Sequence, residues 1–232
     1  EGRGYLAIHS TCGGYHAANL TFRCTQQTCY GPSLFCHNCI VDRHSVLLTH
    51  WIRWNGNFFQ RRSLKDLGLI IQLSHPTGYS CPNPLRANKN FVVIDLTGVH
   101  NIEVNFCQCD SQIKKHQQLM CACWWPATGC DSQTCVTFGT VWLFQILNCQ
   151  GKVSAHNFLR SLELLTNNDG LDPPPDHQCV FCHIVRQYRT ILMLKHGIRG
   201  HDLSGVNGTA QGELALWCRA YPQDEHNLPV GW

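Results

Sequence analysis

The residues best suited to chemistry are the cysteines and histidines that cluster between positions 12 and 50. Thiolates and imidazoles in closely spaced pairs are the ligands that tetrahedral zinc prefers. The sequence offers four successive pairs: Cys12 with a partner still to be assigned, Cys24 with Cys29, Cys36 with Cys39, and His44 with His50. This order predicts a cross-braced module, in which the first and third pairs share one zinc ion and the second and fourth pairs share another.

The sequence specifies the two ions of this module unequally. The second ion has a complete ligand set in Cys24, Cys29, His44 and His50. The first ion lacks an obvious fourth ligand, because Tyr15 stands three residues after Cys12. We expect His16 to complete this site by a one-residue slip, and His9 is an alternative. Cysteines can also be small buried hydrophobic residues, but their spacing here favours metal ligation.

A third group of candidate ligands lies farther along the chain, in Cys81 and the Cys107-x-Cys109 pair. Either His75 or His100 is available as its fourth member. If residues 100 to 107 form one strand, His100 and Cys107 stand roughly 23 Å apart at about 3.3 Å per residue. The loop that carries Cys81 must then fold toward one end of that strand for a metal site to form.

The composition indicates a folded protein with low charge and many cysteines. The 232 residues are 44% hydrophobic and 14% charged, with sixteen cysteines and a formal net charge of +3. This charge is too mild to indicate nucleic-acid binding by itself. Interleaved histidines favour zinc over a disulfide framework, and we expect no membrane-spanning stretch. Phosphate-binding loops, nucleophile elbows and helical HExxH motifs are missing from the sequence, and four-ligand zinc sites are structural, so we expect no catalysis.

The strand and helix patterns that must position these ligands indicate an α+β fold. We expect a zinc module over 1–55, a β-rich part over 56–130 and a helical part over 131–232, the last two forming one unit. The β-rich part should hold a small, mainly antiparallel sheet, with an Asn-Gly turn at 55–56, a hairpin of 91–96 with 102–106 and a strand over 119–125. Helices are predicted over 135–149, over 154–168 with Ser154 as N-cap, and over 176–195.

Beyond these patterns, the sequence resembles the CxC-type cysteine-cluster domains associated with Kyakuja-Dileera-Zisupton (KDZ) transposases. The residues that carry the resemblance include LFCHNCIVDRH, SLKDLGLIIQLSHP, FVVIDLTGVH, VNFCQC, WWPAT and GKVSAHNFLRSLELLTNNDGLDPP. The family has the second cysteine of a Cys-x2-Cys pair where this chain has Tyr15. The resemblance therefore implies that the first zinc site has lost one of its ligands.

The resemblance implies what the domain does and where it acts. It implies a non-catalytic, zinc-binding domain, in part similar to B-box fingers, that helps a nuclear transposase-like protein to recognise DNA or a partner. The first residue is Glu1, so we expect an excerpt of a longer protein, with the family's RNase H-like catalytic domain beyond residue 232. DNA, protein partners and that catalytic domain are the expected partners. The alternative is a B-box-like protein-interaction module without a DNA role.

Overall fold

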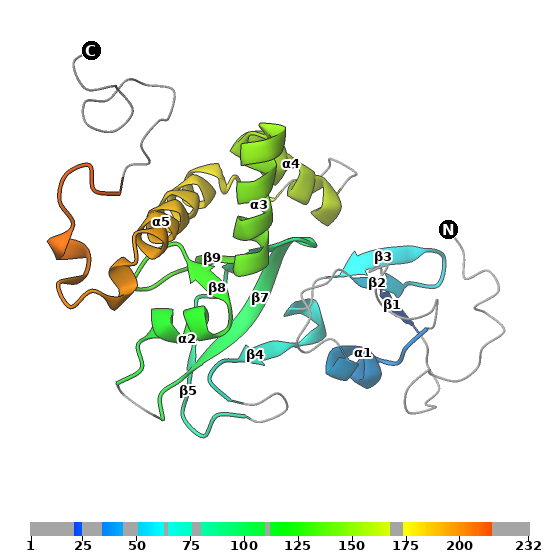
Figure 1. The fold of residues 1–232 in the computed structure, drawn as a ribbon. Helices are drawn as coiled ribbons and strands as arrows, with labels where there is room; N and C mark the ends of the chain where they lie inside the picture. Colours follow the sequence, from blue (N-terminus) through cyan, green and yellow to red (C-terminus); the bar gives the residue numbers. More distant parts are fainter. Residues whose placement is uncertain are drawn as a thin grey trace, which may run out of the picture. The chain divides into compact units, whose positions relative to one another are not determined.

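The computed structural model describes residues 21–24, 34–43, 51–62, 65–75, 80–109, 112–167 and 174–214 (Figure 1). The chain divides into two compact units, Glu1–Val185 and Arg186–Trp232. Within the described part of the chain, no helix has both the length and the apolar character needed to cross a membrane. Strands and helices are mixed but not strictly alternating, which confirms the predicted α+β class.

A small antiparallel sheet belongs to the cysteine-rich N-terminal region. It is built from β1 (Phe22–Cys24), β2 (Trp51–Trp54) and β3 (Phe59–Arg62), in the order β1-β2-β3. The Asn55 side chain accepts hydrogen bonds from the N–H groups of Asn57 and Phe58, which fixes the predicted turn between β2 and β3. Helix α1 (His37–Arg43) contributes Cys39 and Ile40 to a hydrophobic cluster with Phe22 and Phe35.

The larger sheet has six strands and is mixed. Its main path runs in the order β4-β7-β6-β9-β8, with β5 also paired to β7. The β4–β7 and β6–β9 pairs are parallel, and the remaining pairs are antiparallel. The strands are β4 (Ile70–Gln72), β5 (Pro84–Arg86), β6 (Phe91–Asp95), β7 (Gly98–Cys107), β8 (Trp124–Pro126) and β9 (Thr134–Thr137); the short 3-10 helix η2 (Lys65–Leu67) precedes β4.

The long strand β7 organises this sheet, because it pairs with β4 on one edge and with both β5 and β6 on the other. Antiparallel partners of β7 run from Pro84 opposite Cys107 to Asp95 opposite Gly98. Between β5 and β6, the Ala87 N–H still donates to the carbonyl of Val104 at 2.8 Å. The chain from 84 to 95 therefore follows one edge of β7 with a single interruption.

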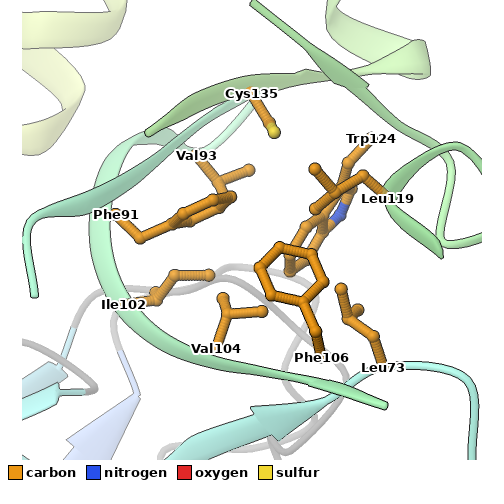
Figure 2. Packing of buried hydrophobic residues seen from close by; sticks show 9 residues of the cluster. All are labelled: Leu73, Phe91, Val93, Ile102, Val104, Phe106, Leu119, Trp124 and Cys135. Atoms are coloured by element: carbon orange, nitrogen blue, oxygen red, sulfur yellow. The ribbon is translucent and has the colours of Figure 1, made fainter. Parts of the chain in front are cut away.

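Side chains of alternate residues divide the sheet into two faces. Phe91, Val93, Ile102, Val104 and Phe106 share one face and form a core with residues from β9 and from α2 (Lys115–Cys121) (Figure 2). The remaining members of this core are Leu73, Leu119, Trp124 and Cys135. Close packing on this face gives the sheet its rigid centre.

Three further helices hold a second layer of buried side chains. They are α3 (Phe138–Gly151), α4 (Ala155–Thr166) and α5 (Gln178–His196). Phe144, Phe158 and Phe181, one from each helix, pack with ring centroids 5.0–5.7 Å apart. The N–H of Val99 in β7 donates to Thr166 Oγ1 at 2.7 Å, which ties the end of α4 to the sheet.

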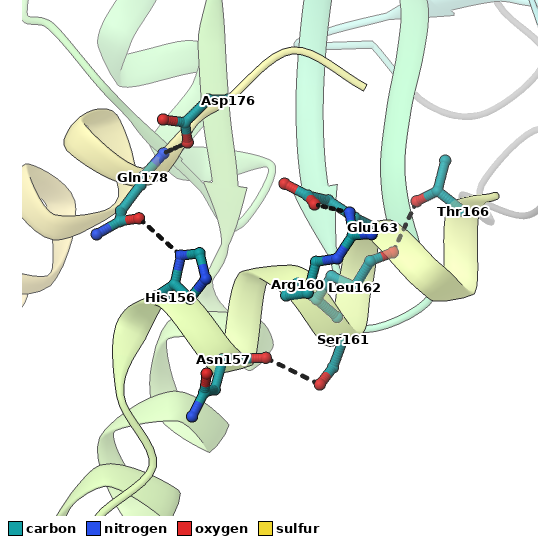
Figure 3. A network of polar contacts seen from close by, with 9 residues as sticks. All are labelled: His156, Asn157, Arg160, Ser161, Leu162, Glu163, Thr166, Asp176 and Gln178. Carbon is teal, nitrogen blue, oxygen red and sulfur yellow. Dashed lines mark hydrogen bonds and ion pairs between the residues drawn. The ribbon is translucent and has the colours of Figure 1, made fainter. Parts of the chain in front are cut away.

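Polar contacts fix the starts of α4 and α5. The predicted cap is confirmed, because the Ser154 side chain accepts a hydrogen bond from the Asn157 N–H at 3.1 Å. Asp176 accepts from the Gln178 N–H at 2.8 Å, and the Gln178 side chain lies 3.1 Å from His156 Nδ1 (Figure 3). These contacts join the first turn of α5 to α4.

The structure corrects two sequence-based predictions of secondary structure. Residues 119–125 are not one strand: α2 ends at Cys121, and Cys123, in the left-handed region with φ of 59°, turns the chain into the short strand β8. The segment resembles a strand in sequence because it is apolar, and part of that apolar character comes from Leu119, which faces the core. The helix predicted from 135 begins only at Phe138, since Cys135 and Val136 pair with β6.

Candidate metal centre

The C-terminal end of β7 brings together four potential metal ligands: His75, Cys81, Cys107 and Cys109. His75 follows β4, Cys81 precedes β5, and Cys107 ends β7. The three strands are hydrogen-bonded neighbours, so the sheet pairing itself delivers these side chains to one place. Ser74 adopts the left-handed conformation with φ of 61°, which turns the chain at the residue before His75.

The distances among the four ligand atoms suit a tetrahedral ion. His75 Nε2 lies 3.2 Å from Cys107 Sγ and 3.9 Å from Cys109 Sγ. Cys81 Sγ lies 3.5 Å from Cys109 Sγ, and all four ligand atoms lie within 4.8 Å of one another. Tetrahedral bonds of about 2.3 Å place sulfur ligands about 3.8 Å apart. The group can therefore hold a metal ion.

Contacts within the group shift the pKa values of two of its thiols in opposite directions. Burial raises the pKa of Cys81, but hydrogen bonds from the Asn83 backbone and from Cys109, Cys107 and His75 lower it to about 7. Hydrogen bonds with Cys81 and Cys107 raise the pKa of Cys109 to about 11, because a proton held between the sulfurs stabilises the pair. The Cys109 N–H also donates to Cys107 Sγ at 3.3 Å. A bound cation would replace the shared proton and favour all three thiolates.

His100, the other histidine offered by the sequence, does not lie in this group. It stands near the start of β7, opposite Val93, and is only 4% exposed. Its Nε2 atom lies 2.8 Å from Thr97 Oγ1. An extended strand cannot bring its two ends together, and His75, the alternative from the sequence, occupies the fourth corner.

The predicted N-terminal ligands are mostly outside the described residues. Cys36 is half-buried and Cys39 is buried in the hydrophobic cluster of α1. Cys24 ends β1. The other predicted ligands of the cross-braced module, Cys12, His16, Cys29, His44 and His50, lie outside the described residues. The cross-braced module with two ions stays a prediction.

No other group of three or more ligand residues converges in the part of the chain that the structure describes. Cys135 is fully buried in the sheet core, where burial raises the pKa of its thiol to about 12. The exposed cysteines of this part are Cys109, already in the group, and Cys121, Cys123, Cys130, Cys149 and Cys179. Within the described residues, one group of cysteines therefore lies among other potential ligands, and the remaining cysteines do not.

The fold and the site define a mixed α+β domain whose cysteines and histidine gather at the end of a central strand. In a comparison with family models, residues 64–170 match the CxC2 like cysteine cluster associated with KDZ transposases. The matched segment contains all four members of the group and the Cys-x-Cys pair that ends β7. The resemblance drawn from the sequence is thereby confirmed over these residues. Comparison with curated proteins and with solved structures gives no match.

Proposed function

We propose that His75, Cys81, Cys107 and Cys109 bind one zinc ion, which stabilises a non-catalytic recognition domain of a transposase-like protein. The observation that carries the proposal is the convergence of these four side chains within the segment similar to the CxC2 cysteine cluster. Three sulfur ligands and one imidazole are a common structural zinc set. With four protein ligands the tetrahedron has no position for a substrate or a reactive water, which supports a structural role.

The domain acts, in this proposal, in the nucleus by helping its protein to recognise DNA or a protein partner. Support comes from the association of the matched family with transposases. The net charge of +3 is compatible with phosphate contacts but does not require them. A zinc-stabilised module that binds only protein is the competing outcome, as in B-box-like interaction domains.

Two measurements test the proposal. The first is metal analysis of the purified protein with and without chelator, followed by circular dichroism. Bound zinc, and loss of folded structure on chelation, support the metal role, whereas folding that resists chelator but collapses with reductant contradicts it.

The second measurement is DNA binding as a function of salt. A logarithm of the binding constant that falls linearly with the logarithm of the salt concentration supports DNA recognition, and the slope reports the number of phosphates contacted at about 0.9 per contact. A zinc-loaded domain that does not bind DNA even at low salt favours the protein-interaction role.

A further inference from the structure

Helix α2 holds a buried polar side chain that the ligand set alone does not explain. Gln118 is 3% exposed and makes three hydrogen bonds with the chain around the metal group. Its Oε1 accepts from the Cys107 N–H at 2.8 Å, and its Nε2 donates to the Cys107 carbonyl at 2.8 Å. The same Nε2 lies 3.4 Å from the carbonyl of Ile113. A buried amide with all these partners satisfied is a strong constraint on the backbone that it contacts.

The place of this amide follows from the hydrogen bonds of β7. On the edge toward β5, the Gln108 N–H donates to the carbonyl of Asn83 at 3.1 Å. On the edge toward β4, the Leu73 N–H donates to the carbonyl of Asn105 at 2.9 Å. Because alternate residues of a strand present their N–H and C=O groups to the same edge, Cys107 faces the β4 edge like Asn105.

Strand β4 ends before it reaches Cys107, since its last pairing is Gln72 with Asn105. The N–H and C=O of Cys107 would otherwise lack a strand partner on that edge. The Gln118 side chain supplies both an acceptor and a donor there, as the backbone of a directly paired antiparallel residue does. It therefore extends the sheet edge by one residue with a side chain.

We propose that Gln118 is a positioning residue for the metal site, which fixes the backbone of Cys107 and thereby the direction of its thiolate. This inference rests on the proposed zinc binding. Cys107 Sγ contacts His75 at 3.2 Å and accepts from the Cys109 N–H, so its placement affects two other ligands. Partners that orient ligands commonly change metal affinity by 10–100-fold.

The test compares two substitutions in the same helix, Gln118→Met and Gln117→Met. Methionine keeps the length of the side chain and has nearly the helix propensity of glutamine. Gln117 is exposed, and its Oε1 accepts from the Lys114 N–H at 2.8 Å, at the start of α2. Gln117→Met thus removes a hydrogen bond of α2 without removing a contact to Cys107.

The measurement is zinc affinity resolved by site. Each protein is equilibrated over a series of buffered free zinc concentrations, treated with N-ethylmaleimide, and analysed by peptide mass spectrometry for protection of Cys81, Cys107 and Cys109. We expect Gln118→Met to require about 10–100-fold more free zinc for half protection, and Gln117→Met to stay within about 2-fold of wild type. Unfolding in chelator gives the stability of each metal-free protein.

The outcomes separate this inference from the proposed function. If zinc does not protect the three cysteines in the wild-type protein, zinc binding itself is refuted. If the wild type is protected and the two variants have equal zinc affinity, Gln118 has only a structural role and the inference is overturned. If Gln118→Met does not fold, Gln118→Glu takes its place: it retains an acceptor for the Cys107 N–H but loses the donor, and unchanged affinity in that variant overturns the inference equally.

Discussion

Exchanging cysteine for serine at two positions should separate a metal ligand from a core residue. Cys109 is exposed, and its Sγ lies 3.5 Å from that of Cys81. Cys135 is 0% exposed in the sheet core, and its Sγ lies 4.0 Å from Ser132 Oγ. The substitution is the same at both positions, so the surroundings alone decide the result.

The two substitutions should destabilise the folded state for different reasons, and only one of them should release zinc. A ligand that binds only the folded state stabilises it by about 4 kcal/mol when its free concentration is 1,000 times its Kd. Cys109→Ser should lose one equivalent of zinc relative to wild type and, in buffer at that concentration, most of this stabilisation. Cys135→Ser should retain all zinc and lose about 1–3 kcal/mol, because its hydroxyl is buried without a well-placed partner.

The assay is zinc content together with urea unfolding in zinc buffer and in chelator. Chelator should destabilise the wild type and Cys135→Ser to a similar extent, and it should have a smaller effect on Cys109→Ser. The difference between proteins cancels any contribution from zinc bound elsewhere in the chain. Wild-type zinc content in Cys109→Ser, or loss of an equivalent in Cys135→Ser, would refute the assignment of the site.

Three further predictions concern the elements around the site. Thr166→Val removes the acceptor of the buried Val99 N–H and should lower the free energy of unfolding by about 1–3 kcal/mol. Ser161→Ala in the same helix loses only a hydrogen bond to its own helix and should lower it by less than about 0.5 kcal/mol. Equal urea midpoints of the two variants would contradict this prediction. Ser74→Val places a β-branched residue at a φ of 61° and should lower the free energy of unfolding by about 1–2 kcal/mol and weaken zinc binding, whereas Ser74→Gly should change neither. Equal zinc affinity of the two variants would show that the turn at Ser74 does not position His75. Burial lowers the pKa of His177 below its usual 6.5, despite nearby carboxylates, so the folded state prefers the neutral ring. The unfolded state therefore gains a proton first, and the protein loses stability as pH falls below about 6.5. Urea midpoints at pH 7.5 and 5.5 should differ less in His177→Phe than in wild type.

Local sequence patterns predicted the parts of the fold that local interactions determine. The β-branched run from Phe91 to Asp95 indicated β6, and Ser154 indicated the start of α4. The helix α2 was missed because its buried Leu119 and the following Trp124 also suit a strand. Gln118 carried no sequence signal, since a glutamine in a polar segment is ordinarily exposed.

The choice of histidine in the metal group could not be made from spacing alone. Both His75 and His100 lie near the cysteines in sequence, and only the pairing of the strands separates them. The parallel pairing of β4 with β7 brings the residue after β4 to the C-terminal end of β7, where Cys107 lies. The His100 side chain lies instead at the other end of β7, on the face of the sheet that carries Asp95, and it contacts Thr97.

The position of the four-residue group indicates what a bound ion would contribute at this end of the sheet. Phe106 faces the apolar core, and because side chains alternate along β7, Cys107 faces the opposite side. On that side the residues before it, Glu103 and Asn105, are half-buried and polar, so hydrophobic contacts do not hold the strands together there. Strands β4 and β5 are only three residues long, which gives them few hydrogen bonds of their own. Ligands that follow β4, precede β5 and end β7 would let one ion join all three strands at the point where the core no longer reaches.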